Sequence, residues 1–272
     1  MNLDWPSPDD QIGDVYAAYA PIYDTLFEDA LGDTEAYVAA ARRRLPPGAT
    51  VLELGVGTGR LTEHYLRAGF RVVGVDSSAE MLGRARARLA PHGDRCRLLH
   101  GDMRALDLGE RFPMIVAPFG TVAHLLGDDD RRRTFGAVHA HLAPGGVFIF
   151  DDLPGWLAGP AGGTTLDLRC VRTDPATGQR VRLQTNLFDA AGAPLSVRYD
   201  FIDWLEPDDR VARRLVVRVV FRNVALDDEL ALLAAAGFRR VDLHGDFDGT
   251  PLDRNRPSAN ARLVAHCHRG DD

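Results

Sequence analysis

The sequence contains no lysine, and all of its 32 basic residues are arginines. Without lysine, no enzyme side chain can form a Schiff base, so pyridoxal-phosphate enzymes and lysine aldolases are excluded. A Walker-type NTPase is excluded for a similar reason, because its phosphate-binding loop requires a lysine. The arginine cluster at 131–133 is short, and we interpret it as part of a helix surface.

Cysteine, positive charge and long apolar runs are also scarce. Three cysteines without a C-x-x-C motif predict neither a disulfide framework nor a zinc site. A net charge of −7 argues against nucleic acid or an anionic membrane as a partner. No apolar stretch approaches the ~20 residues that span a membrane, and the first residues do not resemble a signal peptide. We therefore expect a cytoplasmic protein.

Most of the chain alternates between short β-rich runs and helical patterns. This rhythm predicts a Rossmann-like, doubly wound α/β fold whose seven-stranded sheet is mostly parallel. Five strands come first, and two closing strands follow near the C-terminus. The expected strands are Thr50–Leu54, Arg71–Val75, Arg97–His100, Met114–Val116, Val147–Asp151, Arg240–Leu243 and Arg262–His266.

The pattern changes between residues 166 and 224, where apolar and polar residues alternate between turn-forming breaks. This alternation predicts an inserted antiparallel β meander. We expect an N-terminal helical lid over 1–48, a Rossmann-like domain formed by 49–157 and 224–272, and the β insertion over 158–223.

Three predicted strands end in residues suited to bind a nucleoside. The first runs into Glu53-Leu54-Gly55-Val56-Gly57-Thr58-Gly59, a glycine-rich turn before a helix. Its G-x-G-x-G spacing is one residue shorter than the dinucleotide fingerprint. Asp76 at the second strand can accept hydrogen bonds from ribose, and Asp102 at the third can accept from an adenine amine. A capping box at Ser77-Ser78-Ala79-Glu80 opens the next helix.

These segments resemble motifs I to III of class I S-adenosylmethionine (SAM)-dependent methyltransferases, and later segments resemble their small-molecule branch. The motifs are VLELGVGTGRLT, GVDSSAEML and GDMRALDL, followed by IVAPFGTVAHLL and AGFRRVDLHGDFDGTPL. The resemblance implies SAM as the cofactor. Met81 either packs near the adenine or belongs to the core. The implied cofactor-binding residues are Glu53, Gly55, Gly57, Gly59, Asp76, Ser77, Met81, Asp102, Met103 and Pro118.

The segment after the fourth strand lacks the N-P-P-[YF] motif of enzymes that methylate bases or glutamine, so we expect a small-molecule acceptor. His124 lies just beyond that strand, and a histidine there can take a proton at neutral pH. Its alternative role is that of a core or capping histidine. Tyr19 and Tyr23 resemble the Y-x-x-x-Y-D helix that closes over the cofactor in this branch. We name His124, Tyr19 and Tyr23 as the candidate catalytic residues.

The meander is expected to stand over the carboxyl ends of the strands, where ligands bind in such folds. We predict that it forms the acceptor lid, and a homodimer surface is its second expected role. Candidate acceptor-binding residues are Arg198, Tyr199, Phe201 and Trp204, with Phe247 and Asp248 from the C-terminal hairpin.

Asp151 and Asp152 end the fifth strand and raise the alternative of a metal-dependent O-methyltransferase. A metal site needs a further oxygen ligand within reach, and no pattern supplies one. We therefore interpret both as solvated strand-end acids and predict no metal.

The sequence predicts an enzyme that transfers a methyl group from SAM to an amine of a sugar or other secondary metabolite by in-line displacement. Three alternatives stay open at this point. They are a small-molecule O-methyltransferase, a protein that binds SAM or its demethylated product without transfer, and an NAD-dependent oxidoreductase.

Overall fold

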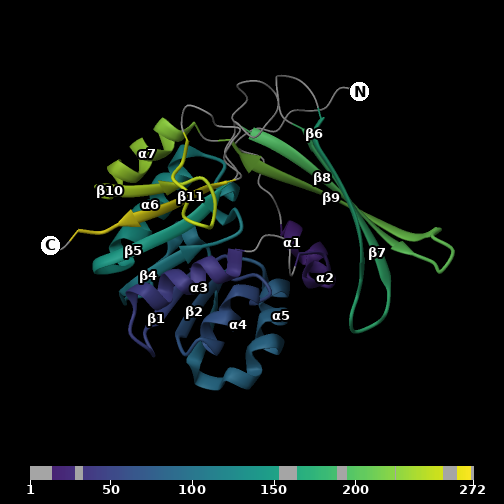
Figure 1. Ribbon diagram of the computed structural model, residues 1–272, viewed down its shortest axis with the longest axis horizontal. Coiled ribbons are helices and arrows are strands. Elements are labelled where there is room, and N and C mark those ends of the chain that lie inside the picture. Colours follow the sequence, from purple (N-terminus) through teal and green to yellow (C-terminus); the bar gives the residue numbers. More distant parts are fainter. Residues whose placement is uncertain are drawn as a thin grey trace.

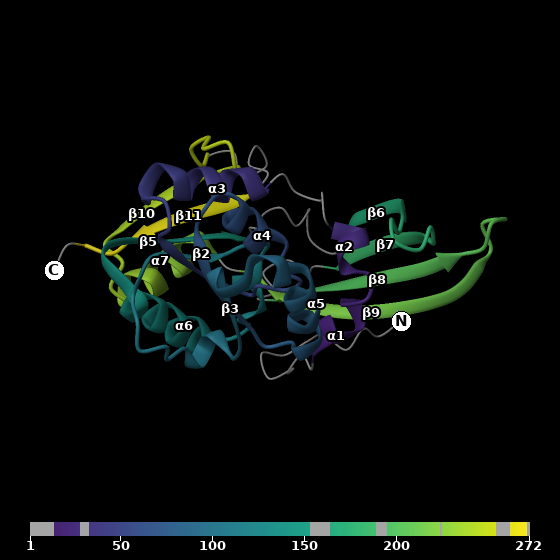
Figure 2. The same cartoon turned by 90° about the horizontal axis from the view of Figure 1, so that it is seen from below.

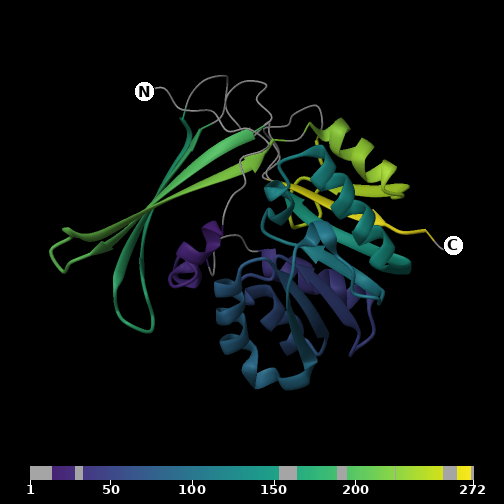
Figure 3. The ribbon, with the colours of Figure 1, turned by 180° about the vertical axis from the view of Figure 1, so that it is seen from behind.

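The computed structural model describes residues 14–27, 33–152, 164–188, 195–223, 225–253 and 262–270. They form a seven-stranded and a four-stranded sheet. Figures 1 and 3 show the four-stranded sheet projecting to one side of the larger sheet, with two short N-terminal helices between them. The expected boundaries at 157, 158 and 224 lie outside the described residues.

The larger sheet has the strand order β10-β11-β5-β4-β1-β2-β3. Strands β1 to β5 pair in parallel, whereas β11 is antiparallel to both β5 and β10. This arrangement confirms the predicted fold class. The strand bounds are Thr50–Leu54 (β1), Arg71–Asp76 (β2), Cys96–His100 (β3), Phe112–Ala117 (β4), Leu142–Asp152 (β5), Arg240–His244 (β10) and Leu263–His268 (β11).

Helices cover both faces of this sheet because its central strands are apolar on both sides. In β1, Leu52 and Leu54 face a core shared with Phe135 and Phe148, while Val51 faces the opposite core. The five larger helices are Asp33–Arg44 (α3), Arg60–Arg67 (α4), Ala79–Leu89 (α5), Asp128–His141 (α6) and Leu226–Ala235 (α7). Short 3-10 helices are Ala90–Arg95 (η1), Met103–Ala105 (η2) and Thr121–His124 (η3).

The start of α5 differs by one residue from the predicted capping box. Ser78, rather than Ser77, is the N-cap, and its side chain accepts a hydrogen bond from Met81 N at 3.3 Å. The reason lies in the preceding strand end, where Asp76 Oδ1 accepts from Ser78 N at 2.8 Å. This bond sets the turn and leaves Ser77 before the cap.

The smaller sheet is an antiparallel meander of β6 to β9, as the alternation predicts. One of its faces packs against the N-terminal helices, where Tyr19, Ile22 and Leu26 meet Leu183 and Ile202 (Figure 2). The bounds are Thr164–Thr173 (β6), Arg180–Phe188 (β7), Leu195–Leu205 (β8), Val211–Arg222 (β9), Val15–Tyr19 (α1) and Tyr23–Phe27 (α2). None of the helices within the described ranges is long and apolar enough to cross a membrane.

Candidate active site

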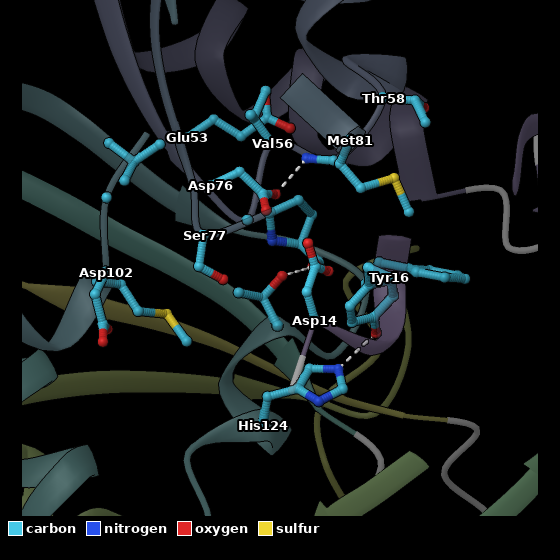
Figure 4. Close-up of a pocket in the computed structure, with 18 of the residues that line it drawn as sticks. Asp14, Tyr16, Glu53, Val56, Thr58, Asp76, Ser77, Met81, Asp102 and His124 are labelled. Carbon is cyan, nitrogen blue, oxygen red and sulfur yellow. Dashed lines mark hydrogen bonds between the residues drawn. The ribbon is translucent and has the colours of Figure 1, made fainter. Parts of the chain in front are cut away.

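A cavity of about 440 Å³ opens at the carboxyl ends of β1 to β4 (Figure 4). Small-molecule sites commonly have volumes of ~300–1,000 Å³. Helix α1 and the loop after β4 also border the cavity, and Thr121 of that loop lies against Gly55. The predicted residues that line the cavity are Tyr23, Glu53, Gly55, Gly57, Asp76, Ser77, Met81, Asp102, Met103, Pro118 and His124.

The glycines of the β1–α4 turn have different surroundings. Gly55, Gly57 and Gly59 all have positive φ angles, of 69°, 55° and 82°. A Cβ on Gly55 would lie 2.6 Å from Thr121 Oγ1, whereas a Cβ on Gly57 would come no closer than 3.9 Å to any atom and would occupy open space. A Cβ on Gly59 would lie 2.8 Å from Leu89 Cδ1. Gly59 therefore permits helix packing, and it is not among the residues that line the cavity.

Asp76 connects two of the strand-end loops. Its Oδ2 accepts a hydrogen bond from Gly57 N at 2.7 Å, and its Oδ1 accepts from Ser78 N. Burial raises the pKa of this carboxyl, although the Ser78 and Gly57 amides lower it in part. The carboxylate is thus held at the cavity wall by backbone N–H groups.

Two of the other acids that line the cavity, Glu53 and Asp102, lie in contrasting environments. Glu53 is 1% exposed and accepts a hydrogen bond from Thr62 Oγ1 at 2.6 Å. Burial raises the pKa of Glu53 to about 8, so this side chain is neutral at pH 7. Asp102 instead pairs with the Arg104 guanidinium at 2.6 Å, which lowers its pKa. Only Asp102 of these two acids brings a negative charge to the cavity.

On the opposite wall, Tyr16 Oη lies 2.7 Å from His124 Nε2 (Figure 4). Burial, and then the nearby Arg198 guanidinium, lower the pKa of His124 to about 4. Burial raises the pKa of Tyr16 to about 12. The imidazole also contacts the Phe221 ring, with 5.0 Å between ring centroids. The pair is therefore uncharged at neutral pH.

The two other tyrosines of the N-terminal helices have separate surroundings. Tyr23 lines the cavity and contacts the Phe119 ring. Tyr19 is fully buried and donates a hydrogen bond to Asp200 on β8, away from the cavity lining. Burial raises the pKa of both phenols.

The structure separates the four residues that we predicted on β8. Successive strand residues point to opposite faces, so Arg198 and Trp204 share one face and Tyr199 and Phe201 share the other. Arg198 lies over the Phe221 ring, 4.9 Å from its centroid, beside His124. On the far face, Tyr199 contacts the Phe188 ring.

The two residues predicted from the C-terminal hairpin, Phe247 and Asp248, are not among the residues that line this cavity. They line a second cavity, of about 550 Å³, together with Tyr37 and His266. The first cavity in turn includes residues that the sequence analysis did not select. These are Asp14, Thr58, Arg60, Thr121 and Asp130, among others.

The strand-end acids are not solvated as predicted. Asp151 and Asp152 are 0% and 5% exposed, and Arg131, expected on a helix surface, is fully buried. Arg131 Nη2 lies 3.3 Å from Asp152 Oδ2, so one buried charge balances the other. Within the described ranges, no group of three or more His, Cys, Asp or Glu side chains could hold a metal ion.

Comparison with known proteins identifies the family. A family model described as a methyltransferase domain matches residues 51–146. The chain is 30% identical over 240 residues to a dTDP-4-amino-2,3,4,6-tetradeoxy-D-glucose N,N-dimethyltransferase of Saccharopolyspora spinosa, covering 86% of this chain and 90% of that protein. The chain belongs to the class I SAM-dependent methyltransferases.

Two further similarities agree with this family. A dTDP-3-amino-3,6-dideoxy-alpha-D-glucopyranose N,N-dimethyltransferase of Streptomyces fradiae is 30% identical over 167 residues, which cover 58% of this chain and 64% of that protein. The crystal structure of Streptomyces venezuelae DesVI matches with a TM-score of 0.71 at 22% identity, covering 94% of this chain and 99% of that one. At this low identity, the similarity to DesVI shows a shared fold and nothing more.

The cofactor of this methyltransferase is SAM, and the residues of the first cavity fit it. Gly57 lines the cavity without a side chain, which leaves room for a ligand against the backbone. Asp76 and Asp102 place carboxylate oxygens, which are strong hydrogen-bond acceptors, at two consecutive strand ends. This cavity therefore has both the volume and the ordered acceptors that an adenosyl group requires.

Proposed function

We propose that this methyltransferase transfers the methyl group to the amine nitrogen of a small molecule, and that the acceptor is an amino sugar. The observation that carries the proposal is the uncharged pair formed by His124 and Tyr16. A histidine with a pKa of about 4 is a weak base and cannot deprotonate a sugar hydroxyl. A neutral amine needs no deprotonation before attack, because its lone pair is already available.

When bound, the cofactor supplies a methyl group that its positively charged sulfur has already activated. The chain must then bind and orient the cofactor and the acceptor and exclude water from the cavity. Alignment of the reactants alone can account for ~7–11 kcal/mol of the barrier. Asp76, Asp102 and the glycine-rich turn hold the adenosyl part. Tyr23 and Phe119 close the cavity with apolar surface.

The hydrogen bond between Tyr16 and His124 suggests how the acceptor nitrogen is oriented. With a pKa of about 12, the Tyr16 hydroxyl keeps its proton, and in the tautomer of His124 whose Nε2 carries no proton it donates to that nitrogen. The phenol oxygen then retains lone pairs that can accept an N–H of the acceptor, which would turn the nitrogen lone pair toward the cofactor. His124 thus fixes the direction of the Tyr16 hydroxyl.

The relatives support an amine acceptor, and their names include amino-sugar N,N-dimethyltransferases and glycine/sarcosine N-methyltransferases. Because the sheet of β6 to β9 lies beside α1, we propose that Arg198 and Trp204, on its inner face, border the acceptor.

Incubation with SAM and a matched panel of acceptors tests the proposal. The panel contains a nucleotide-linked amino sugar, the same sugar with a hydroxyl in place of the amine, and sarcosine. We expect mass spectrometry to detect one or two added methyl groups on the amino sugar and none on its hydroxyl counterpart. Equal methylation of the hydroxyl compound would contradict the choice of nitrogen, and preferential methylation of sarcosine would contradict the sugar.

A further inference from the structure

The loop between β4 and α6 carries His124 and includes an unfavourable backbone conformation. Phe119 and Gly120 both have positive φ angles, of 59° and 68°. Glycine adopts this region readily, but a phenylalanine does so only when its surroundings compensate for the steric cost. Two buried side chains, Asp151 and Arg131, compensate for this cost by hydrogen bonds to the backbone of the loop.

Asp151, at the end of β5, binds the start of the loop. Its Oδ1 accepts hydrogen bonds from Phe119 N at 2.7 Å and Tyr37 Oη at 2.6 Å. Its Oδ2 accepts from Gly120 N at 3.1 Å and lies 3.6 Å from Arg262 Nη1. One carboxylate therefore holds the two N–H groups of the left-handed turn, and a side chain with fewer acceptors could not replace it.

Arg131, on α6, binds the end of the loop. Its Nη2 donates to Val122 O at 3.0 Å, and its Nε donates to Leu125 O at 3.2 Å. These carbonyls lie on both sides of His124 in the sequence. The guanidinium is fully buried, and its charge is balanced by Glu229 at 2.5 Å and Asp152 at 3.3 Å.

The two anchors depend on consecutive residues of one strand. Because side chains alternate along a strand, Asp151 points to the face covered by α3 and Asp152 points to the face covered by α6 and α7. The end of β5 therefore holds the loop in two ways. Asp151 accepts from N–H groups at the start of the loop, and Asp152 pairs with Arg131, which donates to carbonyl groups at its end.

We propose that Asp151 and Arg131 are positioning residues that hold the β4–α6 loop so that His124 and Tyr16 meet at the cavity wall. The inference rests on the proposed function in assigning His124 to the acceptor side. The hydrogen bonds of Asp151 and Arg131 to the loop do not depend on that assignment.

The first test follows the His124 imidazole by NMR in protein with labelled histidine, its signal assigned by its loss in His124→Gln. Among the described residues, Tyr16, Arg198 and Phe221 face this ring. Asp151→Asn places an amide where two N–H donors require acceptors, so the turn should relax and expose the ring.

We expect the pKa of His124 in Asp151→Asn to rise from about 4 toward its ordinary ~6.5. Tyr37→Phe is the matched control, because it removes a hydrogen bond to the same carboxylate and keeps both acceptor oxygens for Phe119 N and Gly120 N. The pKa of His124 should stay unchanged in that variant. An unchanged pKa in folded Asp151→Asn, or an equal rise in Tyr37→Phe, would overturn the proposal.

A second pair of variants applies even if Asp151→Asn fails to fold. A Cβ on Gly120 or on Gly127 meets no atom within 4 Å, but only Gly120 has a positive φ angle. Gly120→Ala should strain the turn and raise the pKa of His124, whereas Gly127→Ala should not. Activity of Gly120→Ala on the amino sugar should fall roughly tenfold. Indistinguishable NMR titrations for the two variants would reject a positioning role for the turn.

The third test addresses Arg131. In Arg131→Gln/Glu229→Gln, one buried charge of each sign is removed together, which limits the loss of stability. The pKa of His124 should again rise, and an unchanged pKa in the folded double variant would remove Arg131 from the proposal. Because the NMR readout needs no acceptor, a wrong acceptor assignment would leave these results intact.

Discussion

The two walls of the first cavity are built in different ways. On the cofactor side, Asp76 is held by backbone amides at Gly57 and Ser78, within the same βαβ unit. On the side of His124, Tyr16 reaches His124 across 108 positions of sequence, and behind this wall Tyr19 reaches Asp200 across 181. The comparison teaches that a site formed by strand ends is local in sequence, whereas one formed by side chains between sheets depends on the whole fold.

The largest expected effect concerns Asp200, which connects β8 to Tyr19 of α1. Asp200 is fully buried and accepts hydrogen bonds from Tyr19 and Thr185, with Arg198 Nε 2.9 Å away. Asp200→Ala would leave the Arg198 guanidinium without its counter-charge, so the free energy of unfolding in urea should fall by about 3–5 kcal/mol. The affinity for S-adenosylhomocysteine should change little.

The control lies on the opposite face of the same strand. Asp203 is itself 2% exposed, but it pairs with Arg182 and Arg214, whose side chains are 36% and 50% exposed and would stay hydrated without it. Asp203→Ala should therefore cost only about 1 kcal/mol. Equal losses for the two variants would mean that the face toward the N-terminal helices has no special role.

The next effect concerns the backbone-held wall. Asp76→Ala removes the carboxylate that we assign to the ribose hydroxyls and releases the Gly57 and Ser78 amides. Charge-assisted hydrogen bonds contribute ~1.5–3 kcal/mol each, so the dissociation constant of S-adenosylhomocysteine should rise about 100-fold in calorimetry. Asp94→Ala, at an exposed position, should leave it unchanged. An affinity for Asp76→Ala within about threefold of the wild type would contradict the placement of the adenosyl group.

The difference between contacts that are local in the sequence and contacts between distant segments explains which features could be predicted from the sequence. The sheet, the glycine-rich turn and Asp76 follow from short motifs, because parallel strands bring consecutive strand ends to one edge. The contact of Asp200 with Tyr19 could not be predicted, because it depends on how the meander packs against α1. Asp151 shows a further reason: its position at a strand end was evident, but only the folded loop provides the amides that make its burial favourable.

The next prediction concerns the pH dependence of the free energy of unfolding, which tests the burial of His124. Because the pKa of His124 is about 4 in the fold and ~6.5 in the unfolded chain, folding favours the neutral ring. This contribution is fully present above pH 6.5 and is lost as the pH falls toward 4. Relative to His124→Gln, wild-type protein should therefore lose about 3 kcal/mol of stability between pH 7 and pH 4, measured by urea unfolding at each pH. A constant difference across that range would refute burial of the ring.

The smallest effect is expected for Tyr16→Phe. The substitution keeps the ring contacts with Tyr19 and Tyr23 and removes only the hydroxyl that lies 2.7 Å from His124 Nε2. If that oxygen orients the acceptor nitrogen, kcat should fall roughly tenfold, which corresponds to ~1.4 kcal/mol, while the affinity for S-adenosylhomocysteine stays constant. A rise in the acceptor KM at unchanged kcat would instead show that the hydroxyl binds the acceptor equally well before and during transfer. In that case the acceptor wall would contribute only binding, and alignment of the nitrogen would have to come from the groups that hold the rest of the sugar.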